Sequence, residues 1–283
     1  MHAEDASEWR RRRSVGSLRR PEASALHTYL LDADDELAEQ FDLRTRLAVR
    51  QGTTVKVLEA PVGECELEPL LTAVGRGLGL LVLDGLLAYE TRVGERTATE
   101  LIGAGDLLQP VGDRADAMLE RTDTWRALWP TRLGLLDSEF VERARPWPQI
   151  LQSLLRRASH RSADIDALRA ITCHPRLEVR LDLVFWHLAA RWGRVEPAGI
   201  RLTLPLTHRL LGQLVAAERP SISHALARLA HAGLVVGTPG DWHLVGCPED
   251  HLSSLIERPV RLAARTHGVG RGPHESGPAE VKF

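Results

Sequence analysis

The pattern of apolar and polar positions predicts strands in the first half of the chain and helices in the second. Between residues 43 and 108, short alternating or wholly apolar stretches are separated by turn residues. We expect strands at residues 53–58, 78–82, 86–91 and 97–102. Asp84 and Gly85 form one expected turn, and Gly94 lies in another. Strands at this spacing predict a small antiparallel barrel or roll.

The period changes to that of a helix near Pro148. From there, apolar residues recur at alternating steps of four and three, as at the a and d positions of a coiled coil. This stripe comprises Trp147, Leu151, Leu154, Ala158, Ile165 and Leu168, and Arg161 interrupts it. A seam between two copies of the chain explains the stripe, and a helix packed on its own domain is the alternative. We therefore predict a dimerisation helix at residues 146–172.

A further helix is expected from Pro175, a residue that suits the first helical turn. Apolar residues between positions 177 and 192 keep the helical period, and Gly193 is expected to end it. His174 and Pro175 thus separate two helices. We predict an inter-domain hinge at this point.

The most informative pattern lies in residues 202–245. Thr207 is a good N-cap for a short helix, and a second helix opens with Pro220 in its first turn. The apolar positions of the second helix recur at helical spacing: Ile222, Ala225, Leu226 and Leu229. They leave a polar face that is narrow enough for a major groove. Gly233 ends the helix, and residues 234–245 predict a hairpin, the wing.

Charge supports nucleic-acid binding only locally. The whole chain has a formal net charge of −2 and gives no such support. The cations of residues 201–230 are Arg201, Arg209, Arg219 and Arg228, and Glu218 is the only acid among them. We therefore expect a basic footprint confined to the two short helices.

Residues 204–235, with the pattern LPLTxxxLxxLVxxxRPSISxALxRLxxxGLV, resemble the C-terminal domain of the CRP/FNR regulator family. RLDLVFWHLAARWG resembles the helix that leads into that domain, and LVLDGLLAYE with LIGAGDLL is similar to strands of the family's cyclic-nucleotide-binding β-roll. The resemblance covers residues 43–246.

The polar composition of the two ends and this resemblance together predict an α+β fold in five segments. A basic, disordered tail occupies residues 1–20, and an antiparallel, jelly-roll-like β-roll sensor domain occupies residues 21–145. A dimerisation helix follows at residues 146–172, and then a winged helix-turn-helix at residues 173–250. A flexible tail occupies residues 251–283.

The resemblance also implies which residues face DNA. They are Thr207, Arg209, Arg219, Pro220, Ser221, His224 and Arg228. Arg219 would donate two hydrogen bonds to a guanine edge, whereas Thr207 and Arg209 would meet phosphate. Pro220 stands where the best-known member has an acidic base-reading residue, so the operator sequence should differ. Docking to a protein is the alternative role of such a domain.

A glycine that is frequent in the turn between the two short helices is replaced here by Ala216 and Ala217. If the turn requires a positive φ angle, an alanine there costs about 1 kcal/mol. A whole domain tolerates that cost.

The sensor domain lacks a clear cyclic-nucleotide site. In cAMP-binding members of the family, a Gly-Asp turn leads into a cassette with a glycine–glutamate pair, and then an arginine followed by a small hydroxyl residue. Gly105 and Asp106 are followed by LLQPVGDRADAM, which has no such pair, and Arg114-Ala115 matches the end only in part. A cyclic phosphate needs amide donors and a cation. We therefore expect that cAMP does not bind.

No cofactor can be assigned. The three cysteines, Cys65, Cys173 and Cys247, form no CxxC pair and are too few for the four ligands of the family's iron–sulfur branch. The 12 histidines leave haem an open question. An acidic cluster at residues 32–36 lacks the spacing of a known metal loop, so we expect a solvated surface rather than a metal site.

No catalytic residue is predicted either, since the sequence has no HExxH, no GxSxG and no phosphate-binding loop. The alternative is a cupin-like β-roll enzyme with an accessory winged-helix protein-interaction domain. That enzyme needs a His/Glu metal set on its strands, and residues 43–108 contain no histidine.

We expect a cytoplasmic protein, because the chain has no secretory signal and no apolar stretch long enough to span a membrane. Double-stranded DNA and a second copy of the chain are the expected partners. RNA polymerase is a further candidate.

Overall fold

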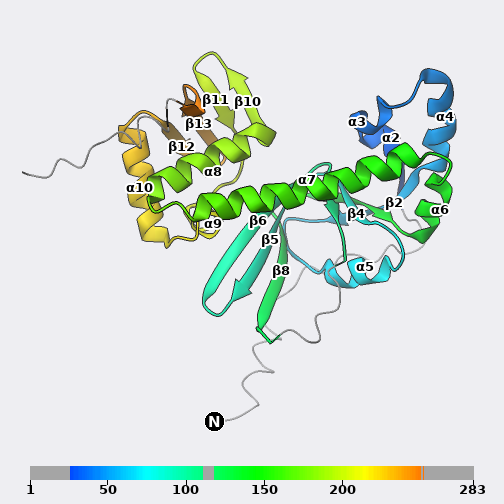
Figure 1. Ribbon diagram of the computed structural model, residues 1–283, viewed down its shortest axis with the longest axis horizontal. Coiled ribbons are helices and arrows are strands. Elements are labelled where there is room, and N and C mark those ends of the chain that lie inside the picture. Colours follow the sequence, from blue (N-terminus) through cyan, green and yellow to red (C-terminus); the bar gives the residue numbers. More distant parts are fainter. Residues whose placement is uncertain (1–25, 111–117, 250, 252–283) are drawn as a thin grey trace, which may run out of the picture.

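The computed structural model describes residues 26–110, 118–249 and 251, which form two parts that share one long helix (Figure 1). The predicted tail at residues 1–20 lies outside the described residues. So do all but one residue of the tail predicted at 251–283, and Arg114 with Ala115. The mixture of helices and antiparallel sheets confirms the α+β class.

The N-terminal part contains two antiparallel sheets. The first has the order β1 (His27–Tyr29), β2 (Thr54–Ala60), β9 (Thr131–Leu136), β4 (Gly79–Asp84) and β7 (Leu107–Leu108). The second has the order β3 (Gly63–Cys65), β8 (Arg121–Ala127), β5 (Leu86–Val93) and β6 (Arg96–Gly103). The four predicted strands correspond to β2, β4, β5 and β6. Strands β8 and β9 are additions to that set.

The two sheets share a core, because alternate side chains of each strand point toward it. Its fully buried members include Leu80, Leu87, Ile102, Leu108 and Leu133. The described strands form two separate sheets and do not close into a barrel. Of the two predicted forms, the roll is therefore the correct one.

Short helices surround these sheets: α2 (Leu30–Ala33), α3 (Asp35–Ala38), α4 (Leu43–Gly52), α5 (Glu68–Ala73) and α6 (Ser138–Ala144). The acidic cluster of residues 32–36 contacts arginines. Asp32 accepts two hydrogen bonds of 2.7 Å from Arg50. Asp34 and Glu36 both pair with Arg157. The cluster is therefore a set of ion pairs, of which Asp32–Arg50 is exposed and Asp34–Arg157 is largely buried, so the solvated interpretation is correct only in part. Among the described helices, none is both long and apolar enough to cross a bilayer.

Helix α7 (Pro148–Thr172) runs along both parts of the molecule (Figure 1). The six residues predicted for a dimer seam, however, contact this chain's own domains. Trp147, Leu151, Leu154 and Ala158 pack in the core formed with α2, α4 and α6, whereas Leu168 packs against the C-terminal core and Ile165 lines a cavity.

This packing removes Leu154 from the predicted seam, whereas the other five residues keep some exposed surface. Leu154 is fully buried, so it cannot meet a second copy. Arg161, which interrupts the apolar stripe, pairs with Glu100 of β6. The first half of the stripe therefore packs on the N-terminal part, whereas Leu168 packs on the C-terminal part and Ile165 is 37% exposed. Among large apolar residues of α7, Leu155 is 47% exposed and points elsewhere.

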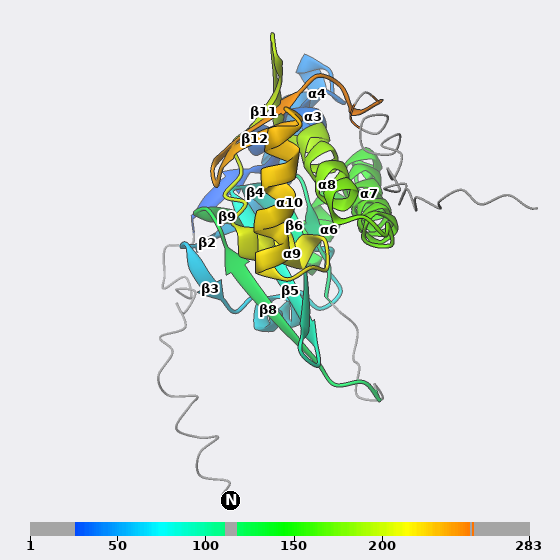
Figure 2. The same ribbon diagram turned by 90° about the vertical axis from the view of Figure 1, so that its left-hand side faces the viewer.

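The C-terminal part contains three helices and a four-stranded sheet. The helices are α8 (Leu177–Trp192), α9 (His208–Leu214) and α10 (Arg219–His231). The sheet has the order β10 (Gly193–Glu196), β11 (Gly199–Leu202), β13 (Asp241–Val245) and β12 (Val235–Thr238). Strands β12 and β13 are the predicted wing. The β10–β11 hairpin was not predicted, and it projects from this part in both views (Figure 1 and Figure 2).

His251 belongs to this C-terminal part rather than to a tail. Its side chain is 1% exposed. The ring lies 2.6 Å from Asp182 Oδ1 of α8, which is also buried, and contacts the backbone oxygen of Val245 in β13. The predicted domain end at residue 250 is therefore too early by at least this residue.

Candidate nucleic-acid interface

The helix-turn-helix consists of α9, a short turn and α10. The side-chain oxygen of Thr207 accepts a hydrogen bond of 3.2 Å from the backbone N–H of Leu210, so Thr207 caps α9 as predicted. Pro220 lies in the first turn of α10, also as predicted. His208 Nδ1 lies 2.9 Å from Ser223 Oγ and links the two helices. This contact therefore helps to hold α9 and α10 at a fixed angle to each other.

The turn between these helices contains a strained residue. Ala216 has a φ angle of +54° and is the only non-glycine residue with positive φ in the described part of the chain. In this left-handed region the Cβ atom crowds the backbone, at a cost of about 1 kcal/mol relative to glycine. The sequence expectation for the alanine pair is confirmed at its first member.

All seven predicted DNA-facing residues lie at the surface: Thr207, Arg209, Arg219, Pro220, Ser221, His224 and Arg228. The opposite face of α10 is fixed in the core by Ile222, Ala225 and Leu229. A helix with one face buried presents the other as a rigid edge. Here the exposed edge carries Arg219, Ser221 and His224 toward solvent.

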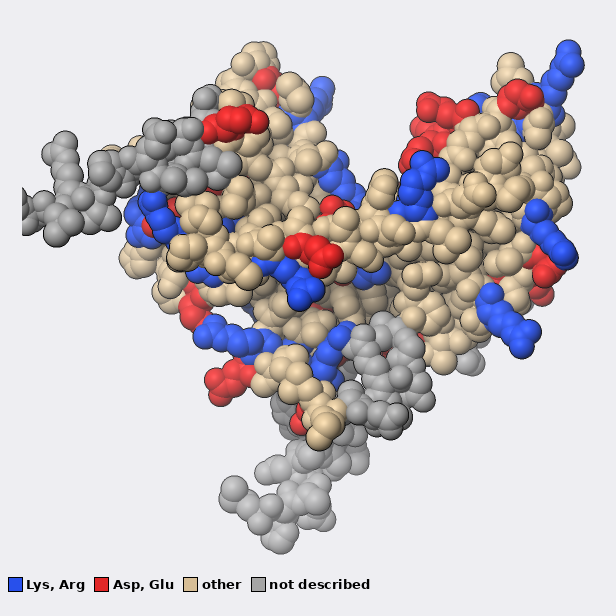
Figure 3. Space-filling model, in the orientation of Figure 1, with Lys and Arg blue, Asp and Glu red and all other residues tan. Residues whose placement is uncertain are grey.

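The arginines of this edge differ in what they contact. Arg228 forms an ion pair with Glu178 of α8, so its charge is partly neutralised within the chain. Among the described residues, no ion pair involves Arg209 or Arg219. Figure 3, which views the helix-turn-helix from the side, shows basic and acidic side chains interspersed on the side of the molecule that faces the viewer. Attraction of DNA must therefore depend on a few arginines.

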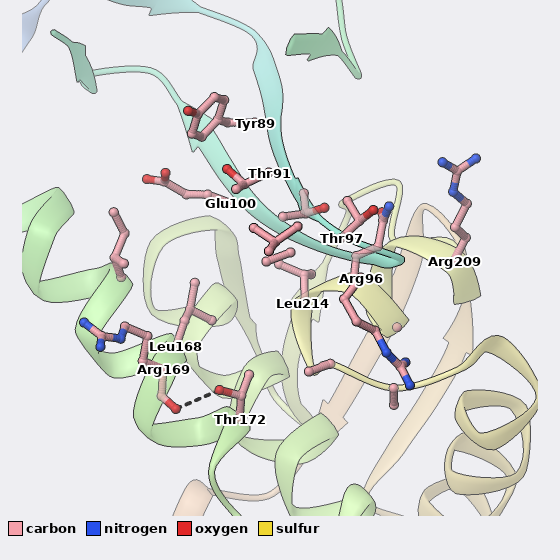
Figure 4. Close-up of a pocket in the computed structure, with 18 of the residues that line it drawn as sticks. Tyr89, Thr91, Arg96, Thr97, Glu100, Leu168, Arg169, Thr172, Arg209 and Leu214 are labelled. Carbon is pink, nitrogen blue, oxygen red and sulfur yellow. Dashed lines mark hydrogen bonds between the residues drawn. The ribbon is translucent and has the colours of Figure 1, made fainter. Parts of the chain in front are cut away.

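A cavity of about 980 Å³ lies beside the helix-turn-helix (Figure 4). Its walls are the β5–β6 hairpin, the second half of α7 and the turn between α9 and α10. Leu168 points from α7 toward the hairpin strands, and Leu214 of α9 lies near the same strands. The cavity therefore borders the sheets of the N-terminal part, the long helix and the helix-turn-helix at once.

The cations of the sensor side of this cavity are already paired. Arg161 donates two hydrogen bonds to Glu100, of 2.6 and 2.9 Å. Arg121 donates to both carboxylate oxygens of Asp123 and, at 2.6 Å, to the hydroxyl of Tyr89. Burial and the Asp123 carboxylate raise the pKa of Tyr89, so the phenol stays neutral. An incoming anion would have to displace a carboxylate here.

The position of Arg121 was missed by sequence reasoning. Arg121 is followed by Thr122, which is the pattern of an arginine before a small hydroxyl residue. Arg114, seven residues earlier, was instead matched to the arginine of cAMP-binding members of the family. The length of the intervening loop hid this match. A search for the Arg–hydroxyl pair over a wider window would have found it.

The Gly-Asp turn joins the sensor domain to α8. Asp106 accepts a hydrogen bond of 2.8 Å from the backbone N–H of Gly103 and pairs with Arg191 at 2.7 Å. Arg191 also donates to the backbone oxygen of Ala104 at 2.9 Å. The turn thus contacts a helix of the C-terminal part.

The thiols and acids offer no metal centre in the described residues, where no group of three or more His, Cys, Asp or Glu is placed to hold an ion. Burial raises the pKa of Cys65 to about 11, so this thiol stays protonated. Neither finding adds a cofactor to the site.

A family model described as a Crp-like helix-turn-helix domain matches residues 179–245. No curated protein matches the sequence. This family model covers α8 through β13 and contains all seven predicted DNA-facing residues.

Several solved structures have a similar fold. A CooA mutant from Carboxydothermus hydrogenoformans has a TM-score of 0.55 at 13% identity, over 83% of this chain and 97% of that one. A cyclic nucleotide-binding domain containing protein from Listeria monocytogenes has a TM-score of 0.55 at 15% identity, over 76% and 97%. The c-di-GMP responsive regulator CLP from Xanthomonas campestris has a TM-score of 0.51 at 16% identity, over 73% and 100%. At these identities the likeness shows the fold.

Proposed function

We propose that this chain, a transcription regulator of the CRP/FNR type, binds a specific pseudo-palindromic DNA site as a homodimer in the cytoplasm. Its matched domain and its fold are those of transcriptional regulators and not of enzymes, which decides against the cupin-like alternative. The observation that carries the proposal is the exposed edge of α10, whose opposite face is locked in the core.

Base readout is assigned to the first turn of α10. Recognition helices contact base edges with their N-terminal residues. Arg219 opens α10 and is exposed, and a guanidinium can donate two parallel hydrogen bonds to O6 and N7 of guanine. Ser221 and His224 lie along the same edge. The side chain of Pro220 has no hydrogen-bond donor, so it would contribute to the fit against DNA by its shape alone.

Phosphate contact is assigned to the start of α9. Thr207 and Arg209 are exposed there, and the first helix of such a motif crosses the DNA backbone. The hydroxyl of Thr207 accepts from its own helix and still has a proton to donate. Arg228 contributes less, because Glu178 neutralises part of its charge.

The homodimer is proposed to form through the outward face of α7. This face carries Leu155, Ser159, Ala163, Asp166 and Ala170, all exposed. They are small or apolar except Asp166, which pairs with Arg169. Small residues let two helices approach closely. A two-fold dimer would place its recognition helices about one DNA turn apart.

We propose further that cAMP is not the effector. Arg121 and Arg161, the two half-buried cations of the cavity's sensor side, already contact carboxylates. The likeness to transcription regulators also supports RNA polymerase as a proposed partner.

The test of DNA binding is a mobility shift with fragments of the protein's own promoter region. We expect at least one fragment to be retarded at low salt, where phosphate contacts are strongest. The same fragment with a scrambled sequence is the control. If no fragment is retarded at low salt, the proposal is wrong.

A further inference from the structure

Strand β6 carries charged side chains toward two other elements. Alternate residues of a strand share a face, so Arg96, Ala98 and Glu100 lie on one face of β6. All three line the cavity, whose other walls are α7 and the α9–α10 turn (Figure 4). A single strand of the sensor domain therefore reaches both the long helix and the helix-turn-helix.

The inner contact of β6 is the pair of Glu100 with Arg161 of α7. The guanidinium donates through Nε and Nη2 to the two carboxylate oxygens, at 2.6 and 2.9 Å. The Arg161 side chain is 20% exposed and that of Glu100 is 15% exposed. A bidentate pair shielded from water fixes both distance and orientation. It therefore sets how α7 lies against the sensor sheet.

The outer contact joins Arg96, at the tip of the hairpin, to Glu218. Arg96 Nη1 lies 2.5 Å from Glu218 Oε1. Glu218 is the N-cap residue of α10 and precedes Arg219 directly. Both side chains are well exposed, so this pair is weaker than the inner one. This pair contributes through its position, because it contacts the N-cap residue of the proposed recognition helix.

Apolar contacts support the two ion pairs. Leu86, Ala88 and Leu101 of β5 and β6 belong to the same core as α8 and α10. Trp192 of α8 packs on Gly103, where a Cβ atom would come within 3.0 Å of the indole nitrogen. The hairpin and the DNA-facing domain therefore share one continuous core.

We propose that β6 acts as a strut that positions α10 for DNA, with Glu100 and Arg96 as positioning residues, so that the protein binds its operator without any small-molecule effector. This inference rests on the proposed function. The carboxylate of Glu100 gives Arg161 an anionic partner from within the chain. The orientation of α7 and of the helix-turn-helix is then set by residues of the chain itself.

The outer contact is tested by charge reversal in the full-length protein. Arg96→Glu alone should lower operator affinity by up to about fivefold, the most that an exposed ion pair contributes. Adding Glu218→Arg exchanges the two charges of the pair and restores the net charge of the wild type. This double variant should recover most of the affinity. Arg92→Glu is the matched control, an exposed arginine on the same hairpin with the same change in charge. An equal loss in Arg96→Glu and Arg92→Glu, with no recovery in the double variant, would overturn the role of Arg96.

The inner contact is tested with Glu100→Gln, which keeps the shape and removes the charge. Binding is measured on the operator and on a scrambled duplex, with protein shown by mass spectrometry to carry no ligand. The specific affinity should fall roughly fivefold or more, and non-specific affinity should change little. Thermal unfolding checks that the variant is folded.

The outcomes separate the inference from the proposed function. If the ligand-free wild type binds the operator and Glu100→Gln binds within about twofold of it, the strut is overturned and the proposed function stands. If the wild type binds only after a small molecule is added, the effector-free part of the inference is overturned. A wild type that binds no DNA in any condition overturns both.

Discussion

Two groups of arginines, one in each part of the molecule, differ in what they contact. In the N-terminal part, Arg121, Arg157 and Arg161 are largely covered and each contacts one or two carboxylates. In the C-terminal part, Arg209 and Arg219 are exposed, and no ion pair involves them in the described residues. The paired arginines stabilise the fold of the chain itself, whereas the unpaired arginines on a rigid edge are available to bind an external anion. A count of arginines in the sequence cannot make this distinction.

The two faces of α7 differ in a similar way, because one is covered by the chain itself and the other is exposed. Leu154 and Leu155, which lie on different faces, test this difference. Leu154→Asp places a carboxylate in a fully buried position and should lower the free energy of unfolding by more than about 3 kcal/mol. Leu155→Asp lies on the outward face and should leave the protein folded but monomeric. Its operator affinity should fall about 100-fold, since two linked half-site contacts become one.

Thermal unfolding, light scattering and mobility shifts give the three readouts for this leucine pair. Leu47→Asp, on the exposed face of α4, is the control for a new surface charge at a leucine. A folded dimer in Leu155→Asp would show that copies meet elsewhere or that the wild type is a monomer.

The two unpaired arginines should themselves differ. Arg219→Ala should cost about 1–3 kcal/mol on the specific site and much less on other duplexes, because it removes a base contact. Arg209→Ala should weaken all duplexes similarly and reduce the salt slope by about one unit. Titrations of both variants on operator and scrambled DNA over a range of salt give these values. Equal proportional losses in both variants on both duplexes would mean that Arg219 contacts only phosphate.

Relief of the strained turn should have a smaller effect. Ala216→Gly removes the Cβ atom at a φ angle of +54° and should stabilise the protein by about 1 kcal/mol. Calorimetry would detect this as a rise in Tm of about 2–4 °C. Ala217→Gly is the matched control, and it should be neutral or destabilising because Ala217 has no positive φ. A rise of the same size in both variants would contradict the assigned strain.

The smallest expected effect is that of cAMP. Titration calorimetry should detect no binding to the wild type, because Arg121 and Arg161 are held by Asp123 and Glu100. A dissociation constant in the micromolar range would show that the nucleotide can displace these carboxylates. The paired arginines of the N-terminal part would then be available to a ligand, and they would no longer differ in this respect from the unpaired arginines.

The C-terminal motif could be predicted closely from the sequence because its signals are local. The cap at Thr207, the proline in the first turn of α10 and the period of its buried residues each depend on neighbours in the chain. A glycine that is frequent at this turn in the resembling family raised the question of a positive φ angle, and Ala216 has one.

Leu154 was wrongly placed in the dimer seam because periodicity identifies an apolar face and not the surface that covers it. Leu154 and Ala158 pack in a core that includes residues of α2 and α4, which lie more than a hundred residues earlier in the chain. Arg161 interrupts the stripe because Glu100, sixty-one residues away, faces it. Contacts of this kind depend on the tertiary fold, and single-sequence patterns do not contain them.

The buried pair of His251 and Asp182 gives the wing an anchor at its far end. The imidazole lies between a carboxylate of α8 and the last residue of β13, so the strand is tied to the helix through a residue six positions later. Deleting the chain from His251 onward would leave the Asp182 carboxylate, fully enclosed, facing an empty space. The gap would admit water behind the sheet, and the wing would fray from that edge inward. Any fusion at the C-terminus should therefore be attached after His251.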